Sequence, residues 1–492
     1  MSLARSSGER RLAYIVQPSC LQHMKLRQWA SRRAGKSAPQ SALELLLDGQ
    51  RASAANGYPQ HWLDGVKSFY DYLEDEATDR VCTGTACRFA RGGPADGTPV
   101  HCLGRCYEAP VTSREHGGPI PRMSLVEPPV ILRHLVDGAQ PNPVAEYAGL
   151  PDPASILDAV VASGLRGRGG AGFPTGAKWR TARDTAAPDR YVVANGDEGD
   201  PGSFIDRLLL EEDPHAVLAG MLACARAIGA RRGVVFIRRE YQRAQTVMRD
   251  AIEWAQSSGY LGNLQVRVVS GAGSYVAGEE TALLRAIEGA RAEPSSKPPF
   301  PAERGLEGLP TVVQNVETLA AIPWVVERRK RADTKVVCVT GAVRRPCAVE
   351  VALGTPLAEV LERACGGAPA GRRWKMALVG GPMGRLLSAQ VFTTPLSFEA
   401  LPGMGHAGVH VFDERTSARA LASHLFEFAA SESCGNCAPC RIGTAQLASR
   451  NSAASLERLL TTLELGSLCG FGQGVPRPIR DLLREFPGEL FA

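Results

Sequence analysis

Short apolar runs alternate with longer stretches of helical spacing between about residues 150 and 325. The apolar runs that suit buried strands are 191–194, 233–237 and 264–269. The stretches 208–228 and 243–255 repeat apolar residues with the period of a helix. Regular alternation of strand and helix predicts an α/β layer with a largely parallel sheet.

The pattern changes after residue 335. Strand-like runs at 336–341 and 349–352 precede one helical run at 354–364, with Pro356 near its start. This mixture predicts a small α+β unit that extends to about residue 410. From Ala418 to the end the spacing is helical with short breaks, which predicts a small helical bundle.

The first 125 residues are the least regular part of the chain. Residues 41–48 and 61–73 have the spacing of short amphipathic helices, and a stretch rich in cysteine follows them. Glycines at 117 and 118 and repeated prolines up to position 153 then predict a linker.

Composition narrows the functional classes. The chain has 492 residues, 44% of them hydrophobic, and a formal net charge of only +5. This excess gives no argument for nucleic-acid binding, and no run of 18 apolar residues predicts a membrane span. The N-terminus lacks the apolar core of a secretory signal. Thirteen cysteines, several at ligand-like spacing, fit a reducing cytoplasm better than a disulfide scaffold.

The most informative motif is Glu432-Ser-Cys-Gly-Asn-Cys-Ala-Pro-Cys-Arg441, followed much later by a fourth cysteine. The array reads C-x2-C-x2-C-x28-C and consists of Cys434, Cys437, Cys440 and Cys469. Three closely spaced thiolates can hold one face of a compact cluster, and a distant fourth completes the set. The spacing favours a [4Fe–4S] cluster, whereas structural zinc more often uses two separated C-x2-C pairs.

A glycine-rich loop follows in the α/β segment. The run 164–179 reads GLRGRGGAGFPTGAKW and holds six glycines within thirteen residues, with Arg166, Arg168 and Lys178. Such a loop lets the backbone approach a ligand closely, and its N–H groups and cations suit phosphates. It is neither a phosphate-binding Walker A loop nor a clean dinucleotide fingerprint. A merely flexible loop is the alternative, but the embedded Arg, Lys and Phe favour ligand binding.

Two more segments have the composition of ligand loops. The acidic run 195–202 follows a predicted strand, where carboxylates suit sugar hydroxyls, although it could equally be only an acidic turn. The run 271–285 joins a strand to a helix whose N-terminus can hold a phosphate. Glu279 and Glu280 in its first turn could instead complement the helix dipole. The rigid run 297–301 presents one cation and one aromatic ring.

Taken in order, these motifs resemble a known family. They are similar to the flavin-bearing, NADH-oxidising subunit of respiratory complex I and its relatives in soluble NAD-linked hydrogenases and formate dehydrogenases. The motifs are GLRGRGGAGFPTGAKW, the Asn195 turn, GAGSYVAGEETAL, KPPFP, TVVQNVETL and ESCGNCAPCRIGT. The resemblance covers residues 145–480 and implies FMN and NADH bound face to face beside a [4Fe–4S] cluster.

The resemblance also implies site residues. Those expected to contact FMN are Gly167, Arg168, Gly169, Gly170, Lys178, Asn195, Asp197, Glu198, Gly278, Glu279, Asn315 and Thr318. Those expected to contact NADH are Phe173, Asp200, Glu280, Lys297 and Phe300. Arg168 and Lys178 would neutralise phosphate charge. The chain departs from the family pattern at Asp200, Thr181 and Gln314.

The first segment is similar to the thioredoxin-like [2Fe–2S] subunit of the same systems. Its cysteines have the spacing C-x4-C-x14-C-x3-C, and the implied ligands are Cys82, Cys87, Cys102 and Cys106. The gap of fourteen is shorter than the family's, which indicates a trimmed domain. Zinc or an empty relic of a site is the alternative. Fusion of the two units in one chain is typical of hydrogenase and formate dehydrogenase diaphorases.

Together these features predict an NADH-dependent oxidoreductase subunit, cytoplasmic, within a multi-subunit redox complex. The expected domains are a truncated thioredoxin-like domain (1–125), a Rossmann-like FMN/NADH domain (126–330), a ubiquitin-like domain of SLBB type (331–412) and a helical bundle (413–492). NADH is expected to transfer a hydride to the flavin, and the flavin then to pass single electrons to the clusters. No catalytic acid or base is therefore expected. A complex I-like subunit, a flavin-less electron carrier and a zinc-stabilised scaffold are the alternatives.

Overall fold

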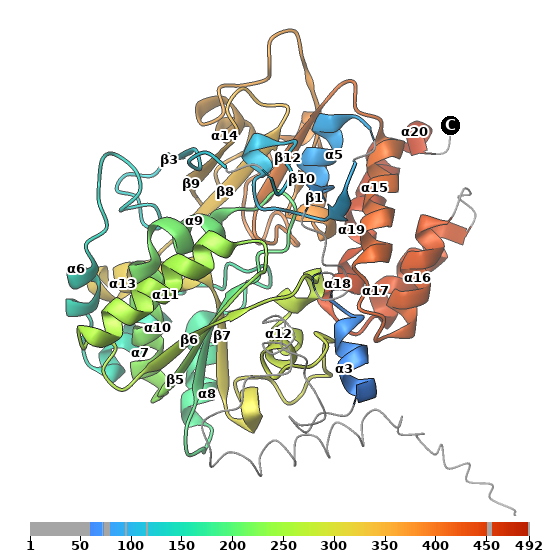
Figure 1. Cartoon of the computed structure of the whole chain (residues 1–492). Coiled ribbons are helices and arrows are strands. Elements are labelled where there is room, and N and C mark those ends of the chain that lie inside the picture. The colour runs from blue at the N-terminus through green and yellow to red at the C-terminus, as the bar shows by residue number, and fades with distance from the viewer. Residues whose placement is uncertain are drawn as a thin grey trace, which may run out of the picture. The chain divides into compact units, whose positions relative to one another are not determined.

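The computed structural model describes residues 60–70, 72, 79–93, 96–114, 117–449 and 455–490, all within the unit Ser41–Ala492 (Figure 1). The helix expected at 41–48 lies outside the described residues. None of the helices in these ranges is both long enough and apolar enough to cross a bilayer.

A four-stranded sheet forms the centre of the segment that was predicted to be α/β. Its strands are β4 (Tyr191–Gly196), β5 (Arg232–Ile237), β6 (Gln265–Ser270) and β7 (Thr311–Asn315). Their order is β6-β5-β4-β7, and every neighbouring pair is parallel. The mixed α/β class and three of the strands were predicted correctly. The apolar pattern had not indicated the fourth strand, β7.

Helices accompany these strands. They are α6 (Pro143–Ala148), α7 (Pro153–Ala162), α8 (Thr175–Asp184), α9 (Ile205–Glu212), α10 (Pro214–Ile228), α11 (Gln242–Ser257), α12 (Glu280–Ile287) and α13 (Val316–Arg328). Helix α10 packs closely on α13, because a Cβ at Gly220 would lie 2.1 Å from the carbonyl oxygen of Leu319.

Helical spacing was predicted over 208–228, and the structure has two helices there, α9 and α10, instead of one continuous helix. The chain breaks at Asp213, whose backbone has φ −139° and ψ 53°. Pro214 then begins α10. Proline lacks an N–H group and disfavours helical geometry in the residue before it, so the break follows from the local sequence.

A second, six-stranded sheet occupies the middle of the chain. Its strands are β3 (Arg122–Ser124), β8 (Thr334–Gly341), β9 (Cys347–Ala352), β10 (Trp374–Val379), β11 (Arg385–Ser388) and β12 (Gly408–Asp413). The order is β11-β10-β12-β8-β9-β3. The β8–β12 and β3–β9 pairs are parallel and the others antiparallel. Strand β3 therefore joins this sheet, although the sequence pattern placed it in the first segment.

Short helices complete the regions of both sheets. They are α14 (Leu357–Arg363) and the single-turn helices η3 (Tyr275–Gly278), η4 (Leu306–Gly308), η5 (Gly381–Met383) and η6 (Ala389–Val391). Pro356 lies at the N-cap of α14, one position before the helix itself.

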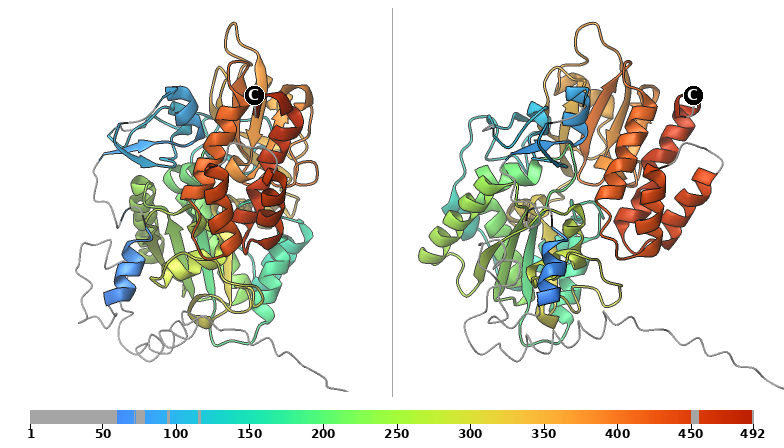
Figure 2. Two further views of the ribbon diagram at one scale, coloured as in Figure 1. Left: turned by 90° about the vertical axis from the view of Figure 1, so that its right-hand side faces the viewer. Right: turned by 45° about the vertical axis from the view of Figure 1, so that its right-hand side comes forward.

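The C-terminal part is helical, as predicted. Its helices are α15 (Ala418–Ser431), α16 (Ala438–Ala448), α17 (Leu456–Gly466), α18 (Gly470–Gly474), α19 (Pro476–Glu485) and α20 (Pro487–Leu490). Figure 2 shows α15, α16 and α17 side by side in orange and red. The core of the C-terminal helices includes Leu421 and Leu425 of α15, Leu460 of α17 and Ile479 of α19, all nearly inaccessible.

The N-terminal cysteine segment is a small α/β element. Helix α3 (Gln60–Lys67) is followed by β1 (Arg80–Cys82), α5 (Thr85–Arg91), β2 (Thr98–Val100) and η2 (Cys106–Glu108). Strands β1 and β2 pair in parallel. The segment is anchored on α15, because the hydroxyl of Thr85 lies 3.2 Å from Nε2 of the buried His424.

Candidate cofactor and cluster sites

The predicted flavin residues meet at the carboxyl edge of the four-stranded sheet. Because all four strands are parallel, the loops after them open at one edge. The amide of Asn195, in β4, donates to the carbonyl of Gly278, which follows β6 (2.8 Å). Lys178, in α8, donates to the carbonyl of Val313 in β7 (3.1 Å). Segments widely separated in sequence thus form one site.

The glycine loop folds back on itself above this edge. The N–H of Gly167 donates to the carbonyl of Phe173 (2.9 Å). A Cβ at Gly169 would lie 3.0 Å from Cβ of Asn315, and Gly170 has a φ of +115°. Gly170 also forms an isolated bridge with Gly405, which precedes β12. Glycine is required here because the backbone approaches its neighbours so closely.

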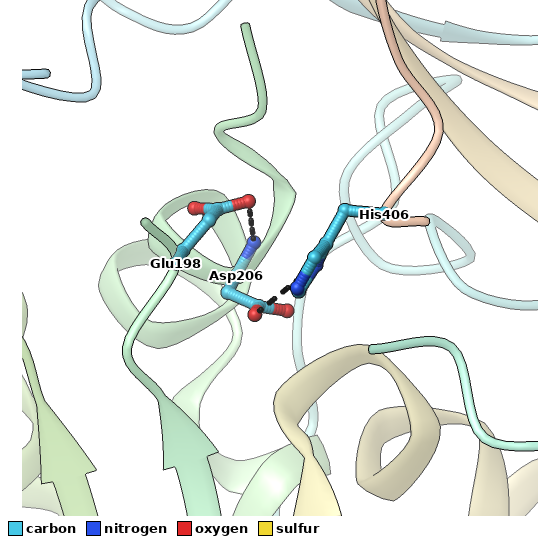
Figure 3. Close-up of side chains that lie close together, drawn as sticks. All are labelled: Glu198, Asp206 and His406. Atoms are coloured by element: carbon cyan, nitrogen blue, oxygen red, sulfur yellow. Dashed lines mark hydrogen bonds and ion pairs between the residues drawn. The ribbon is translucent and has the colours of Figure 1, made fainter. Parts of the chain in front are cut away.

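The acidic loop after β4 sends its carboxylates in different directions. The Glu198 carboxylate accepts from the N–H groups of Asp206 and Arg207, both at 3.1 Å, and so caps α9 (Figure 3). Asp200 accepts from the hydroxyl of Tyr275 at 2.5 Å. Burial raises the pKa of Asp197 to about 8 and that of Asp200 to about 6. The Asp197 carboxyl is therefore mostly neutral at pH 7.

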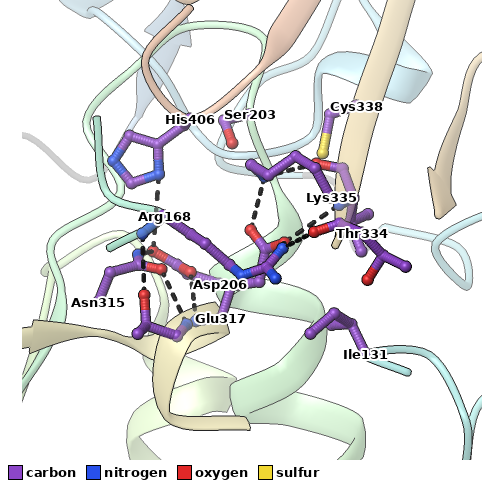
Figure 4. A network of polar contacts seen from close by, with 12 residues as sticks. Ile131, Arg168, Ser203, Asp206, Asn315, Glu317, Thr334, Lys335, Cys338 and His406 are labelled. Carbon is purple, nitrogen blue, oxygen red and sulfur yellow. Dashed lines mark hydrogen bonds and ion pairs between the residues drawn. The ribbon is translucent and has the colours of Figure 1, made fainter. Parts of the chain in front are cut away.

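Arg168 does not present its guanidinium group to the loop surface. The group donates to the carbonyls of Ala332 (2.7 Å) and Thr334 and lies 3.4 Å from Glu317 (Figure 4). Its backbone N–H donates to the hydroxyl of Thr318 (2.9 Å). The side chain thus fastens the loop to α13 and β8. The structure differs here from the expected neutralisation of phosphate by this group, for which Lys178 remains.

Charged and aromatic groups lie around the N-terminus of α12. The carboxylate of Glu279 accepts from the N–H groups of Thr281 (2.8 Å) and Ala282 (3.0 Å) as the N-cap. Lys297 contacts Glu279 (2.8 Å) and Glu280 (2.7 Å), and Lys178 contacts Glu280 (3.1 Å). Burial alone would raise the pKa of Glu280, but the two lysines lower it overall. Glu280 is therefore ionised at neutral pH.

Two aromatic rings of this region are exposed. Phe173, in the glycine loop, is 53% exposed, and Phe300, in the proline-rich loop, is 52% exposed. Large exposed apolar side chains often mark a binding surface. Both residues are among the predicted NADH contacts.

Asn315 and Thr318 begin α13. Oδ1 of Asn315 accepts from the N–H of Thr318 (3.3 Å), and its amide nitrogen donates to Asp206 (2.6 Å). Asp206, Tyr275 and His406 also belong to this region, and they were not predicted. Tyr275 lies within the motif GAGSYVAGEETAL, but no local pattern relates Asp206 to His406.

The four C-terminal cysteines converge where the helices break. Cys434 and Cys437 lie between α15 and α16, Cys440 lies in the first turn of α16, and Cys469 is the N-cap of α18. The hydroxyl of Ser433 lies 3.3 Å from Sγ of Cys440, and the N–H of Leu468 donates to Sγ of Cys437 (3.5 Å). N–H groups directed at sulfur are typical of iron–sulfur sites, where they tune the potential.

The N-terminal cysteines also converge, but deep in the protein. Cys82 ends β1, Cys87 lies in α5, and Cys102 and Cys106 flank a turn, with their sulfurs 3.5 Å apart. The N–H of Gly104 donates to Cys102 (3.3 Å). The N–H of Gly202, in the loop after β4, donates to Cys106 (3.2 Å). The cysteine site is thus in direct contact with the loop that follows β4 and Asn195.

Three known protein families match successive parts of the chain. They are the Nuo51 FMN-binding domain (160–324), the SLBB domain (336–387) and the NADH-ubiquinone oxidoreductase-F iron-sulfur binding region (420–492). The mitochondrial NADH dehydrogenase (ubiquinone) flavoprotein 1 of Dictyostelium discoideum is 37% identical over 374 residues, which cover 68% of this chain and 78% of that protein. The chain belongs to the NADH dehydrogenase flavoprotein 1 family.

Hydrogenase components are also similar to this member of the flavoprotein 1 family. The NADP-reducing hydrogenase subunit HndC of Solidesulfovibrio fructosivorans is 40% identical, over 69% of this chain and 76% of HndC. The crystal structure of an NAD+-reducing [NiFe]-hydrogenase in the H2-reduced state matches with a TM-score of 0.80 at 30% identity, over 92% of each chain. The resemblance inferred from the motifs is confirmed, as are the oxidoreductase class and the presence of FMN-binding and [4Fe–4S]-binding regions.

The geometry of this chain fits both FMN and a [4Fe–4S] cluster. At the sheet edge, Oδ2 of Asp197 and Nε2 of Gln314 are buried without a hydrogen-bond partner among the described residues, as expected where a polar ligand belongs. The glycines leave space beside the backbone of the loop, and a Cβ atom would fill part of this space. At the C-terminal cysteine site, four closely placed thiols lie near backbone N–H donors. The [2Fe–2S] group stays a prediction.

Proposed function

We propose that the chain is the NADH-oxidising flavoprotein subunit of a multi-subunit redox complex. FMN, when bound, accepts a hydride from NADH and releases electrons singly to iron–sulfur clusters. The observation that carries the proposal is that the glycine loop, the acidic loop, the α12 N-terminus and the β7 end all meet at one sheet edge.

Different residues at this edge of the sheet bind different parts of FMN and NADH. Lys178 and the loop N–H groups provide positive charge and donors for phosphate. Phe173 and Phe300 offer exposed aromatic faces for the nucleotide. Asn195, Asn315 and Thr318 are held in place by hydrogen bonds within the protein, so the edge is preorganised for a ligand.

Tyr275 supports the transfer of electrons towards the C-terminal cluster. Its hydroxyl donates to Asp200 (2.5 Å), and its backbone N–H donates to Glu432 (2.9 Å), two residues before Cys434. Its ring lies 5.5 Å from the ring of Phe471, two residues after Cys469. One residue thus connects the acidic loop with both parts of the cluster-binding segment.

We further propose that the N-terminal segment is a trimmed thioredoxin-like domain that holds a [2Fe–2S] cluster. The parallel β1–β2 pair beside α5 and the convergence of four buried thiols support this. The domain limits follow the sequence prediction of 1–125, 126–330, 331–412 and 413–492, with a Rossmann-like, an SLBB-type ubiquitin-like and a helical domain after the first. Pairing of β3 with β9 argues for moving the first limit before Arg122.

We infer that the complex is of the hydrogenase type. A hydrogenase subunit is 40% identical over 69% of this chain, and the structural likeness to the NAD+-reducing hydrogenase covers 92% of it, which is more than the residues 160–492 spanned by the three family matches. The structural likeness therefore includes part of the N-terminal segment, as a fused chain of the hydrogenase type would. A complex I-like assembly is the second candidate, and a formate dehydrogenase stays a prediction from the sequence.

Anaerobic purification tests the main proposal. The protein should carry FMN, identified by absorbance and by chromatography of the released flavin, and should reduce an artificial electron acceptor with NADH. Gly170→Val should lose flavin, whereas Gly354→Val, at another positive φ (+97°) with open space around it, should keep it. A flavin-free protein inert to NADH would reject the proposal, and zinc without iron would favour a scaffold.

The nucleotide preference can be tested at Glu280. Its ionised carboxylate should repel the 2′-phosphate of NADPH if it lies near the adenosine ribose. Glu280→Ala should raise the ratio of NADPH to NADH turnover, while Glu253→Ala, an exposed carboxylate on α11, should not. An unchanged ratio would remove Glu280 from this role.

A further inference from the structure

A group of buried charges lies beneath the flavin edge of the sheet (Figure 4). It brings together residues from the glycine loop, the loop after β4, α9, α13, β8 and the loop before β12. Its members are Arg168, Glu198, Asp206, Glu317, Lys335 and His406. The three carboxylates are inaccessible to solvent, and both cations are almost so.

Both cations of the group, Arg168 and Lys335, form ion pairs with Glu317. Lys335 Nζ lies 2.6 Å from its Oε2, and the Arg168 guanidinium lies 3.4 Å from its Oε1. Glu198 is satisfied differently, since it accepts from the hydroxyls of Ser203 (2.7 Å) and Tyr241 (3.1 Å) as well as from two backbone N–H groups. These two carboxylates therefore have what an ionised group needs.

Asp206 has no such compensation. It accepts from the amide of Asn315 (2.6 Å) and from the N–H of Glu317 (3.3 Å). The basic group closest to it is Nδ1 of His406, 4.0 Å from its Oδ2 (Figure 3). Nδ1 is itself buried and makes no hydrogen bond to the described residues.

The balance of charge in this group indicates that either Asp206 or His406 carries one proton. Three ionised carboxylates against two cations would leave an unbalanced negative charge in the interior, which costs several kcal/mol. Burial and the neighbouring Glu198 and Glu317 raise the pKa of Asp206, while Lys335 acts in the opposite direction. Burial lowers the pKa of His406. The group is neutral when Asp206 or His406 carries one proton.

A bound metal ion explains the arrangement less well. One ligand atom each from Glu198, Asp206 and His406 lies within 4.8 Å of the others. Each carboxylate oxygen of Glu198 and Asp206, however, already accepts a hydrogen bond from within the protein. The carboxylate oxygens of this network are therefore satisfied by donors of the protein, without a metal ion.

We propose that one proton resides on either Asp206 or His406, and that this shared proton keeps the buried charge beneath Asn315 balanced, so that FMN can bind. Loss of the proton would leave an unbalanced negative charge beneath the site of the anionic FMN, and it would strengthen the hydrogen bond by which Asp206 draws the Asn315 amide away from that ligand. His406 connects the pair to the site, because the preceding residue, Gly405, bridges to Gly170 of the glycine loop. The inference rests on the proposed function, since it takes FMN as the ligand at this edge.

The test is the pH dependence of FMN binding to flavin-free protein, measured by quenching of flavin fluorescence. Affinity of the wild-type protein should fall as pH rises through the pKa of the pair, by up to about tenfold per pH unit. Asp206→Asn, which mimics the protonated acid, should bind FMN without this fall. His406→Asn should shift the pH at which it begins.

His215→Asn is the matched control. His215 is also partly buried, its pKa is likewise lowered by burial, and it bonds to Tyr147 at 3.0 Å instead of to the site. This variant should keep the wild-type profile, and ionisations of FMN itself are common to all four proteins. Comparison of their melting temperatures separates a folding defect from a change in proton linkage.

The outcomes separate the two proposals. If the wild-type protein binds FMN and all four profiles coincide, the shared proton is rejected while the function stands. If the wild-type protein binds no FMN, both fail. A wild-type profile that disappears with EDTA, together with a divalent ion lost in Asp206→Asn, would replace the proton by a metal.

Discussion

The two cysteine sites of this chain differ in how they are enclosed. The predicted N-terminal ligands, Cys82, Cys87, Cys102 and Cys106, are at most 4% exposed. Of the C-terminal four, only Cys440 is buried, and the other three are partly exposed. The N-terminal site is closed by a segment from another part of the chain, through Gly202. The C-terminal site is built by neighbouring helices and stays near the surface.

This difference suits different electron partners. A cluster near the surface lies closer to a second subunit than an enclosed one, which favours faster electron exchange with that subunit. Three large apolar side chains are exposed close to the C-terminal site: Ile442 (51%), Leu465 (80%) and Leu468 (39%). The proposed exit of electrons to a partner therefore belongs on this side.

The largest effect is expected from removal of a ligand at the open site. Cys469→Ala should lose about four iron atoms per chain, because no other cysteine among the described residues lies beside this set. Cys224→Ala, a lone buried cysteine in α10, should lose none. Iron and sulfide analysis measures both. Retention of all iron in Cys469→Ala would show that the array is not the ligand set.

A single methyl group should disable the enclosed site. In Gly104→Ala the Cβ would lie 2.3 Å from the ring of Tyr241, at a φ of +66°. We expect loss of about two iron atoms with the C-terminal cluster intact. Gly92→Ala, at a φ of +71° with nothing within 4 Å, is the control. Equal iron content in the two variants would contradict the expected closure.

Accessibility should also separate the sites kinetically. An iron chelator added after mild oxidation should remove iron in two phases, first from the partly exposed C-terminal site and then from the buried N-terminal site. The amplitudes should be near two to one, as [4Fe–4S] and [2Fe–2S] clusters require. Iron release in the opposite order would overturn the comparison.

The smallest effect concerns the anchor of the enclosed site. Thr85→Val removes the hydroxyl that meets Nε2 of the buried His424. Leaving this nitrogen without a partner should lower the free energy of unfolding by about 1–3 kcal/mol. Denaturant unfolding measures it, with Thr246→Val on the exposed face of α11 as the control. A stability equal to that of the control would mean that the contact does not hold the segment.

The sequence predicted the parts of the fold that depend on local patterns. The strands β4 and β5 follow from apolar runs, and β6 follows from a run in which Gln265 and Arg267 alternate with apolar residues. The C-terminal cysteine array follows from its spacing, because three of its members are close in the chain, whereas the N-terminal array was implied by the family resemblance. The break between α9 and α10 was missed although Pro214 indicated it. Strand β7 was not predicted, since its polar end, Gln314 and Asn315, obscured the apolar run.

Other features depend on contacts that no local pattern contains. Asp206 and His406 are 200 positions apart, and only the packing of the β12 loop on α9 brings them together. Glu198 stands in the acidic run, but its role as the cap of α9 depends on how the chain turns after it. Arginine is a residue type that often binds phosphate, yet the guanidinium group of Arg168 donates to backbone carbonyls of the segment that follows α13.

The loop after β4 spans two sites with a fixed number of residues. Asn195 at its start is tied to Gly278, and Gly202 at its end is tied to Cys106. An inserted or deleted residue between them would break one of these contacts or the other. Engineered length changes should therefore be placed elsewhere in the chain, such as the surface turn at Gly259, where a side chain meets nothing.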